Sequence, residues 1–183
     1  VSVRSAGFRD VVREILPDEL GRTITVVLEP LPGRIDASTG RDFPETRWRI
    51  DGVLVATATG IDREMVAGTY ALNVNHPHYQ VVDQSVELER GKTEKIRLDL
   101  APVDGRLAIN SKPAGAEIFL DEQKIGVNPL DMPLAGGSYQ LRIVAPDRQP
   151  VEETVQITNT APLIERLYNL KPVSSTLKIV AIP

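Results

Sequence analysis

The stretch AGTYALNV at residues 67–74 returns about 70 residues later as GGSYQLRI at residues 136–143. In both copies every second residue from the tyrosine onward is apolar, as in Tyr70, Leu72 and Val74. Successive side chains of a strand point to opposite faces, so this alternation predicts a strand with one buried face. A period this long is the size of a small domain, because solenoid repeats are about 20–50 residues long. The sequence therefore predicts two small domains of one fold.

Other segments repeat in the same order. RWRIDG at 47–52 matches EIFLDE at 117–122, and ITVVLEP at 24–30 matches LAINSKP at 107–113 and LKIVAIP at 177–183. On this alignment Pro30, Pro113 and Pro183 close the same element in three units. Turn residues interrupt the pattern every 8–12 residues and helix signals are nearly missing, which is typical of sandwiches. We expect an all-β fold of two small antiparallel, Ig-like β-sandwich domains in tandem.

The strand pattern predicts where the two units differ. We expect strands near 22–29, 47–51, 53–57, 69–75, 79–89 and 93–100, then near 105–112, 116–121, 137–145, 150–158 and 163–170. Pro30 to Asp51 spans 21 positions and Pro113 to Asp121 only 8, which leaves 13 extra residues in the first unit. They fall at 31–46, where Gly, Pro, Ser, Thr and Asp indicate a loop.

These segments give a domain layout. Residues 1–20 are either the final hairpin of a preceding repeat or a short amphipathic helix ended by Pro17, because Phe8, Val11, Val12 and Ile15 have helical spacing. Residues 21–103 form a divergent repeat with the insertion at 31–46, residues 104–173 form the second repeat, and residues 174–183 begin a further one. We expect the chain to be part of a longer protein.

Composition argues against several functional classes. Lys and Arg number 21 against 25 Asp and Glu, a formal net charge of −4, and no basic cluster is present to bind nucleic acid. No run of 18 apolar residues exists, so we expect no membrane insertion within this segment, although an anchor outside it is compatible with the sequence. The lack of cysteine excludes disulfides, thiolate metal sites and thiol nucleophiles.

Metal and cofactor sites are not predicted. His76 and His78 have a chelating spacing, but Pro77 between them indicates a loop, and zinc needs three or four ligands. Asp36 and Asp42 lie in a stretch that does not meet the EF-hand pattern. We therefore expect no metal and no cofactor.

Catalysis is not predicted either. The carboxylate pairs, such as Asp121 with Glu122 and Glu152 with Glu153, are adjacent in sequence, and adjacent strand side chains face opposite ways. No Gly-x-Ser-x-Gly elbow is present. We expect no catalytic residues and no enzyme activity.

Three motifs of the second unit point to a known family. Pro113 to Ala116 read Pro-Ala-Gly-Ala, Gly126 to Pro129 read Gly-Val-Asn-Pro, and Gly137 to Tyr139 read Gly-Ser-Tyr. The unit resembles a PEGA domain, whose motifs are Pro-Glu-Gly-Ala, Gly-x-Thr-Pro and Gly-x-Tyr. The first unit keeps WRIDG at 48–52 and the Gly-x-Tyr motif but lacks the tetrapeptide, so it resembles a divergent copy. The resemblance implies a β-sandwich of bacterial and archaeal envelope proteins, on the extracytoplasmic side of the membrane, with no catalytic residues.

From this resemblance we expect a non-catalytic extracytoplasmic module, periplasmic or at the cell surface, that acts as a spacer or a protein-interaction module of a bacterial cell-envelope protein. The alternative is a module that binds carbohydrate, such as a cell-wall glycan. It would be favoured if Trp48, Tyr70 and Tyr139 were exposed in a row.

The partner is then a protein or a cell-wall glycan. Its candidate site is the insertion of the first unit, where Arg34, Asp36, Arg41, Asp42 and Phe43 combine charge with an aromatic ring. Long loops without regular structure are often functional. The alternative is that the insertion is a loop that has drifted in sequence and has no function.

Overall fold

The computed structural model describes residues 1–174, so nearly all of the further strand expected at 174–183 lies outside the described residues. The chain divides into two compact units. The first comprises Val1–His76 and Gln80–Leu100, and the second comprises Pro77–Tyr79 and the chain from Ala101 onward.

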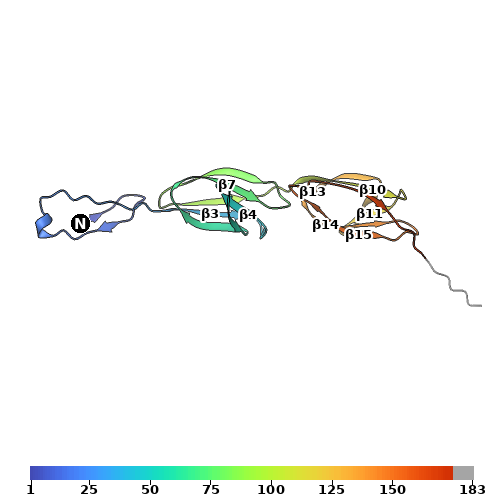
Figure 1. Cartoon of the computed structure of the whole chain (residues 1–183), viewed down its shortest axis with the longest axis horizontal. Helices are drawn as coiled ribbons and strands as arrows, with labels where there is room; N and C mark the ends of the chain where they lie inside the picture. Colours follow the sequence, from blue (N-terminus) through green and yellow to red (C-terminus); the bar gives the residue numbers. More distant parts are fainter. Residues whose placement is uncertain (175–183) are drawn as a thin grey trace, which may run out of the picture. The chain divides into compact units, whose positions relative to one another are not determined.

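The first unit contains a sandwich of two sheets (Figure 1). One sheet has the order β6-β3-β9, with β3 (Gly33–Thr39), β6 (Gly60–Met65) and β9 (Thr93–Leu98). The other has the order β5-β4-β7-β8, with β4 (Arg47–Ile50), β5 (Val53–Thr57), β7 (Gly68–Asn75) and β8 (Val82–Leu88). Alternate residues of both sheets are buried in one core, among them Ile35, Trp48, Leu72, Val74 and Val86.

The second unit repeats this arrangement. Its three-stranded sheet has the order β13-β10-β16, with β10 (Asp104–Lys112), β13 (Leu130–Ala135) and β16 (Leu163–Asn169). Its four-stranded sheet has the order β12-β11-β14-β15, with β11 (Glu117–Leu120), β12 (Gln123–Val127), β14 (Gly137–Val144) and β15 (Val151–Ile157). The core is apolar and draws on both sheets through residues such as Leu107, Ile118, Leu141, Ile157 and Ile164.

The predicted all-β sandwich fold is confirmed, with one difference in strand direction. The last strand of each unit crosses to the three-stranded sheet and runs parallel to the first strand, as β9 beside β3 and β16 beside β10. The remaining neighbours within each sandwich are antiparallel, as expected.

The loop expected at 31–46 is wrong, because Gly33–Thr39 is strand β3. Its counterpart is β10, since Arg34 and Arg106 each pair with an aspartate across the sheet, Asp62 and Asp131 respectively. Gly33 to Arg47 spans 14 positions and Gly105 to Glu117 spans 12, so the first unit has two extra residues and not 13. The inward positions of β3 include Ala37 and Thr39, which give a weak apolar alternation.

The strand expected at 22–29 is also wrong. Residues 23–29 have no regular structure, and Pro30 makes only an isolated bridge to Phe8. The apolar residues of ITVVLEP correspond to those of IRLDLAP at 96–102, the segment that contains the end of β9. In both sandwiches this last strand pairs only with the first strand of its sheet. Residues 22–29 have no such neighbour, so no ladder forms despite the strong pattern.

Residues 1–20 contain a hairpin and no α-helix. Strands β1 (Ser2–Val3) and β2 (Val11–Val12) pair antiparallel, and Pro17–Glu19 form a single 3₁₀ turn, η1. The helical spacing of the apolar residues is overridden because a helix this short is marginal without packing on a core. The helix alternative is therefore wrong for this segment.

Candidate binding surfaces

The aspartates of the two β-hairpin turns are structural. Asp51 Oδ1 accepts a hydrogen bond from Ala71 N at 2.8 Å, and Asp121 Oδ1 accepts one from Gln140 N at 2.8 Å. Both residues have a φ of 48°, a region that aspartate tolerates better than most residues. The same carboxylate contact in both units indicates that these groups fasten each turn to the neighbouring strand.

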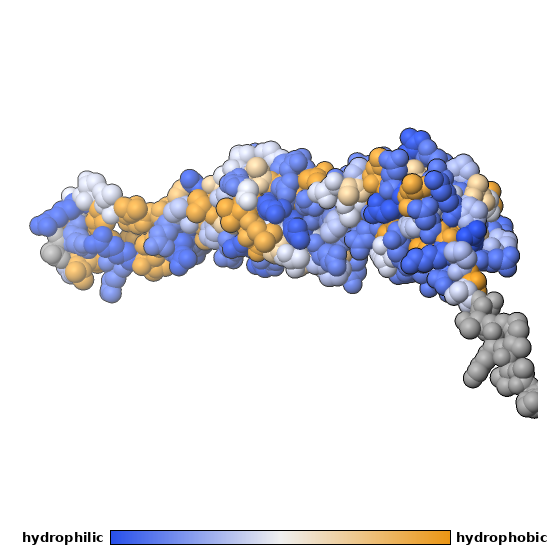
Figure 2. All heavy atoms as spheres, turned by 45° about the vertical axis from the view of Figure 1, so that its right-hand side comes forward, coloured by the Kyte–Doolittle hydropathy of each residue, from blue (hydrophilic) through white to orange (hydrophobic). Residues whose placement is uncertain are grey.

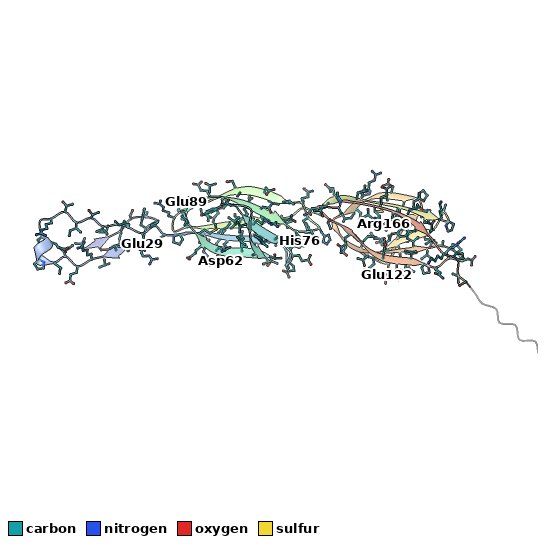
Figure 3. All side chains as sticks on the ribbon, in the orientation of Figure 1. Glu29, Asp62, His76, Glu89, Glu122 and Arg166 are labelled. Atoms are coloured by element: carbon teal, nitrogen blue, oxygen red, sulfur yellow. The ribbon has the colours of Figure 1, made fainter. Side chains whose placement is uncertain are left out.

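The other carboxylate pairs do not converge. Glu153 accepts a hydrogen bond from the Tyr168 hydroxyl, and burial together with this contact raises the pKa of Tyr168 well above its usual value. Glu152 is exposed, and Glu122, labelled in Figure 3, lies in the exposed turn between β11 and β12. The adjacent pairs therefore separate as expected, although Glu122 and Glu152 line one surface hollow together with Arg142.

The two histidines make separate contacts. His76 is buried within the first unit, and its ring centroid lies 5.3 Å from that of Phe43. His78 belongs to the second unit, where its Nδ1 lies 2.8 Å from the carbonyl oxygen of Ile157. In the part of the chain that the structure describes, no three His, Cys, Asp or Glu residues gather as a metal site would require.

The aromatic residues do not form an exposed row. Trp48 is fully buried, and its Nε1 donates a hydrogen bond to the carbonyl oxygen of Ala58 at 2.8 Å. The half-buried Tyr70 and Tyr139 donate their hydroxyls to backbone oxygens four residues earlier, at 2.7 and 2.9 Å. The condition that would favour a sugar-stacking platform is therefore not met.

The glycine of the Gly-x-Tyr motif in the second unit, Gly137, has a steric function. A Cβ at Gly137 would lie 2.9 Å from the hydroxyl oxygen of Tyr139 and 3.0 Å from its ring, so the tyrosine folds back over the bare backbone of this glycine. Burial raises the pKa of Tyr139, in agreement with its position against the core. This motif is therefore a packing device.

The five residues of the predicted partner site are distributed over two structures. Arg34 and Asp36 lie on β3, where Arg34 Nε donates to Asp62 Oδ1 at 2.6 Å. This contact raises the pKa of Arg34 and lowers that of the Asp62 carboxyl. Arg41, Asp42 and Phe43 follow β3 in the connection to β4, where the ring of Phe43 packs against His76. The predicted residues therefore do not form a single loop surface.

Sequence reasoning missed a groove on the three-stranded sheet of the second unit. Asn110, Leu130, Glu165, Arg166 and Leu167 are among the residues that line it, on β10, β13 and β16. Figure 3 labels Arg166 in this unit. The signal for the groove is apolar residues on both faces of β16.

The exposed leucines of β16 have polar counterparts in the first unit. Leu163 and Leu167 are 54% and 63% exposed, on the same strand as the buried, inward-facing Ile164. Leu163 pairs with Arg106, whose counterpart Arg34 pairs with Thr93. The outward face of the three-stranded sheet is thus more apolar in the second unit than in the first.

Comparison with known proteins supports the division into units. Residues 105–172 match the PEGA domain family. The matched residues run from the second residue of β10 to just past β16, which is one complete seven-stranded sandwich. PEGA domains are typically extracellular or periplasmic modules. A search of curated proteins found no match.

Two solved structures extend the comparison of the fold. The Bacillus anthracis TIE protein is similar over 80% of this chain and 35% of its own length, with a TM-score of 0.51 and 16% sequence identity. At this identity the similarity shows the fold alone, and the chain spans about a third of that protein. A leucine-rich repeat protein from Bacteroides thetaiotaomicron is 13% identical over 81% of this chain and 27% of its own, but its TM-score of 0.23 supports no argument.

The described residues also contain no helix long and apolar enough to cross a membrane.

Proposed function

We propose that the chain is a non-catalytic spacer outside the cytoplasm, part of a bacterial cell-envelope protein, which holds or presents a neighbouring domain through protein contacts. The observation that carries this proposal is the parallel pairing of the first and last strands of each sandwich, β3 with β9 and β10 with β16. The chain enters a unit at the start of one strand and leaves it at the end of its neighbour.

This connectivity suits a module under tension. A pull on the chain draws two parallel neighbours past each other along their axes and loads all the hydrogen bonds of the ladder together. In the second unit this parallel ladder has seven residue pairs, from Arg106 with Leu163 to Lys112 with Asn169. A ladder pulled from one end opens one pair at a time and resists less. Spacers of envelope proteins are the class of module in which this resistance is useful.

Single-molecule force measurements test the proposal, because the native chain has no cysteine to interfere with attachment. Cysteines at Asp104 and Asn169 load the β10–β16 ladder in shear, from the start of β10 to the end of β16. Cysteines at Asp104 and Ala135, which are paired across β10 and β13, open their ladder from one end. We expect a clearly higher unfolding force for the first pair. Equal forces for the two pairs would argue against a tension-bearing spacer.

Location is tested in cells that produce the full-length protein. The exposed Val27 is replaced by cysteine, and intact cells are treated with a maleimide that does not cross membranes. We expect labelling before lysis. Labelling only after lysis would contradict an extracytoplasmic position while leaving the force experiment unaffected.

A further inference from the structure

The hairpin of the first 13 residues has the same register as the hairpin between the two longest strands of each four-stranded sheet. In all three hairpins the last pair before the turn encloses seven residues; these pairs are Val3 with Val11, Val74 with Val82, and Ile143 with Val151. The register continues outward, because Val1 and Arg13 exchange backbone hydrogen bonds just as Leu72 pairs with Gln84. Residues 1–13 thus correspond to the end of β7 and the start of β8.

The turn of each hairpin makes the same contacts. A residue of the turn bridges a proline further along the chain, as Phe8 with Pro30, Tyr79 with Pro102, and Arg148 with Pro172. The turn residue before it accepts a backbone hydrogen bond from the residue after that proline, as Gly7 from Leu31, His78 from Val103, and Asp147 from Val173, at 2.9, 3.1 and 3.1 Å. Residues 1–30 therefore correspond to the closing strands of a sandwich.

The side chains of this segment repeat the core pattern without a core. Leu72 and Val86 of the first unit are 1% and 4% exposed, whereas their counterpart Val1 is 72% exposed and Ile15 is half-buried. An apolar groove runs along the segment and is lined by Val3, Ile15, Leu20, Ile24 and Val26, among others. Figure 2 shows hydrophobic surface over this N-terminal segment.

The backbone of the segment is incomplete in the same way. In the two sandwiches the last strand pairs with the first strand, and β7 and β14 also pair with β4 and β11. Neither neighbour is present within residues 1–30, so β1 has only β2 as a partner and residues 22–29 form no strand. An apolar face beside unpaired strand backbone is a surface that another set of strands can complete.

We propose that this apolar face of residues 1–29, the half-sandwich face, binds the opening strands of another repeat of this kind, which correspond to β10–β13 and to the part of β14 before Leu141, the counterpart of Val1. The missing neighbours identify this occupant strand by strand: a parallel strand beside residues 22–26 and an antiparallel strand beside β1. Strand β7 begins six residues before the counterpart of Val3, so the opening strands run straight into the half-sandwich.

The test supplies the opening strands from the protein itself. Residues 105–142 are joined in front of residue 3 of the full chain, because Ile143 is the counterpart of Val3. A second extended chain has residues 33–73 in the same place. The reporter is Ile15→Cys, whose counterparts Val86 and Val155 are 4% and 3% exposed, with the exposed Glu14→Cys as matched control.

We expect the rate of thiol labelling at Ile15→Cys to fall at least tenfold in an extended chain, while Glu14→Cys keeps its rate. Leu107→Asp within the added copy of residues 105–142 should restore labelling, because it places a charge in the new core. If Ile15→Cys reacts as fast in both extended chains as in the unextended one, the proposal is wrong. It is also wrong if labelling of the unextended chain slows as its concentration rises, since the occupant is then a second copy.

Discussion

The two sandwiches use different side chains at the same place in their structures. In the first unit Trp48 fills the space, and its indole nitrogen donates to the carbonyl oxygen of Ala58. In the second unit the smaller Ile118 stands at the position of Trp48, and Asn128 stands at that of Ala58. The positions are equivalent because Ala58 N donates to the carbonyl oxygen of Thr46 at 2.9 Å, and Asn128 N donates to that of Ala116, the counterpart of Thr46, at 2.8 Å.

The side-chain amide of Asn128 hydrogen-bonds to the backbone of Ser111 on β10, as a neighbouring strand would. Its Oδ1 accepts from Ser111 N at 2.7 Å and its Nδ2 donates to Ser111 O at 2.9 Å. In the first unit the counterpart Thr39 N donates to the carbonyl oxygen of Thr59 instead. The Gly-x-Asn-Pro motif of the second unit is thus a hydrogen-bonding device, and the first unit replaces it with an aromatic ring and a backbone contact.

The largest effect is expected for Trp48→Ala. Removal of a fully buried indole leaves a cavity and an unpaired carbonyl, which should cost the first unit about 3–5 kcal/mol of unfolding free energy. Chemical denaturation followed by circular dichroism should show one early transition and one unchanged transition. A uniform loss in both transitions would contradict the separate cores of the two units.

Asn128→Ala should have the next largest effect, and on the second unit alone. It leaves both backbone groups of the buried Ser111 without their partner, which costs about 2–3 kcal/mol. The matched control is Asn110→Ala, next to Ser111 on β10, where the side chain is exposed. Hydrogen exchange at Ser111, measured by mass spectrometry, should rise in the first variant and not in the control.

The same variant sharpens the comparison between the units. Ile118→Trp combined with Asn128→Ala recreates the pair found in the first unit, and it should recover part of the lost stability. A double variant no more stable than Asn128→Ala would show that the two solutions depend on their surroundings and are not interchangeable.

The sequence predicted the sandwich fold, because the alternation in the strands around Tyr70 and Tyr139 is strong and glycines mark their ends. It placed the first strand of unit one wrongly because ITVVLEP is more strand-like than GRIDAST. Strand formation depends on a neighbour, which residues 22–29 lack and Gly33–Thr39 have on both sides. The loop expected around the candidate partner site was wrong for the same reason, because Arg34 and Asp36 lie on a strand and no local pattern reveals that Asp62 lies opposite Arg34. The role of these residues in binding stays a prediction.

Thr46→Val should give a smaller effect of opposite sign. Thr46 is fully buried, and its hydroxyl has no hydrogen-bond partner among the described residues, while Ala116 holds the equivalent place in the second unit. Replacing the hydroxyl with a methyl removes an unpaired polar group and should stabilise the first unit by about 1 kcal/mol. Thr39→Val is the control, because that hydroxyl donates to backbone oxygens and its loss should destabilise. Denaturation followed by the fluorescence of Trp48 reports both, and a loss of stability in Thr46→Val would contradict the assignment.

The smallest effect is expected at the ion pair that both units share. Arg106 Nε donates to Asp131 Oδ1 at 2.6 Å, and this hydrogen bond, with the charge of the guanidinium, lowers the pKa of the Asp131 carboxyl. A carboxyl whose folded pKa is lowered contributes stability above its unfolded pKa of about 3.9 and loses that contribution as the pH falls through the folded pKa. Asp131→Asn should therefore lower the stability of the second unit slightly near neutral pH, and the difference from the native chain should vanish in strong acid. Because the pair is exposed and screened by salt, the difference should also shrink at high ionic strength.

Asp62→Asn is the matched variant, since the Arg34–Asp62 pair has the same geometry and its loss should act on the first unit alone. Denaturation midpoints measured across the acid range decide the matter: a deficit that persists unchanged in strong acid would mean that the aspartate acts through packing and not through its charge.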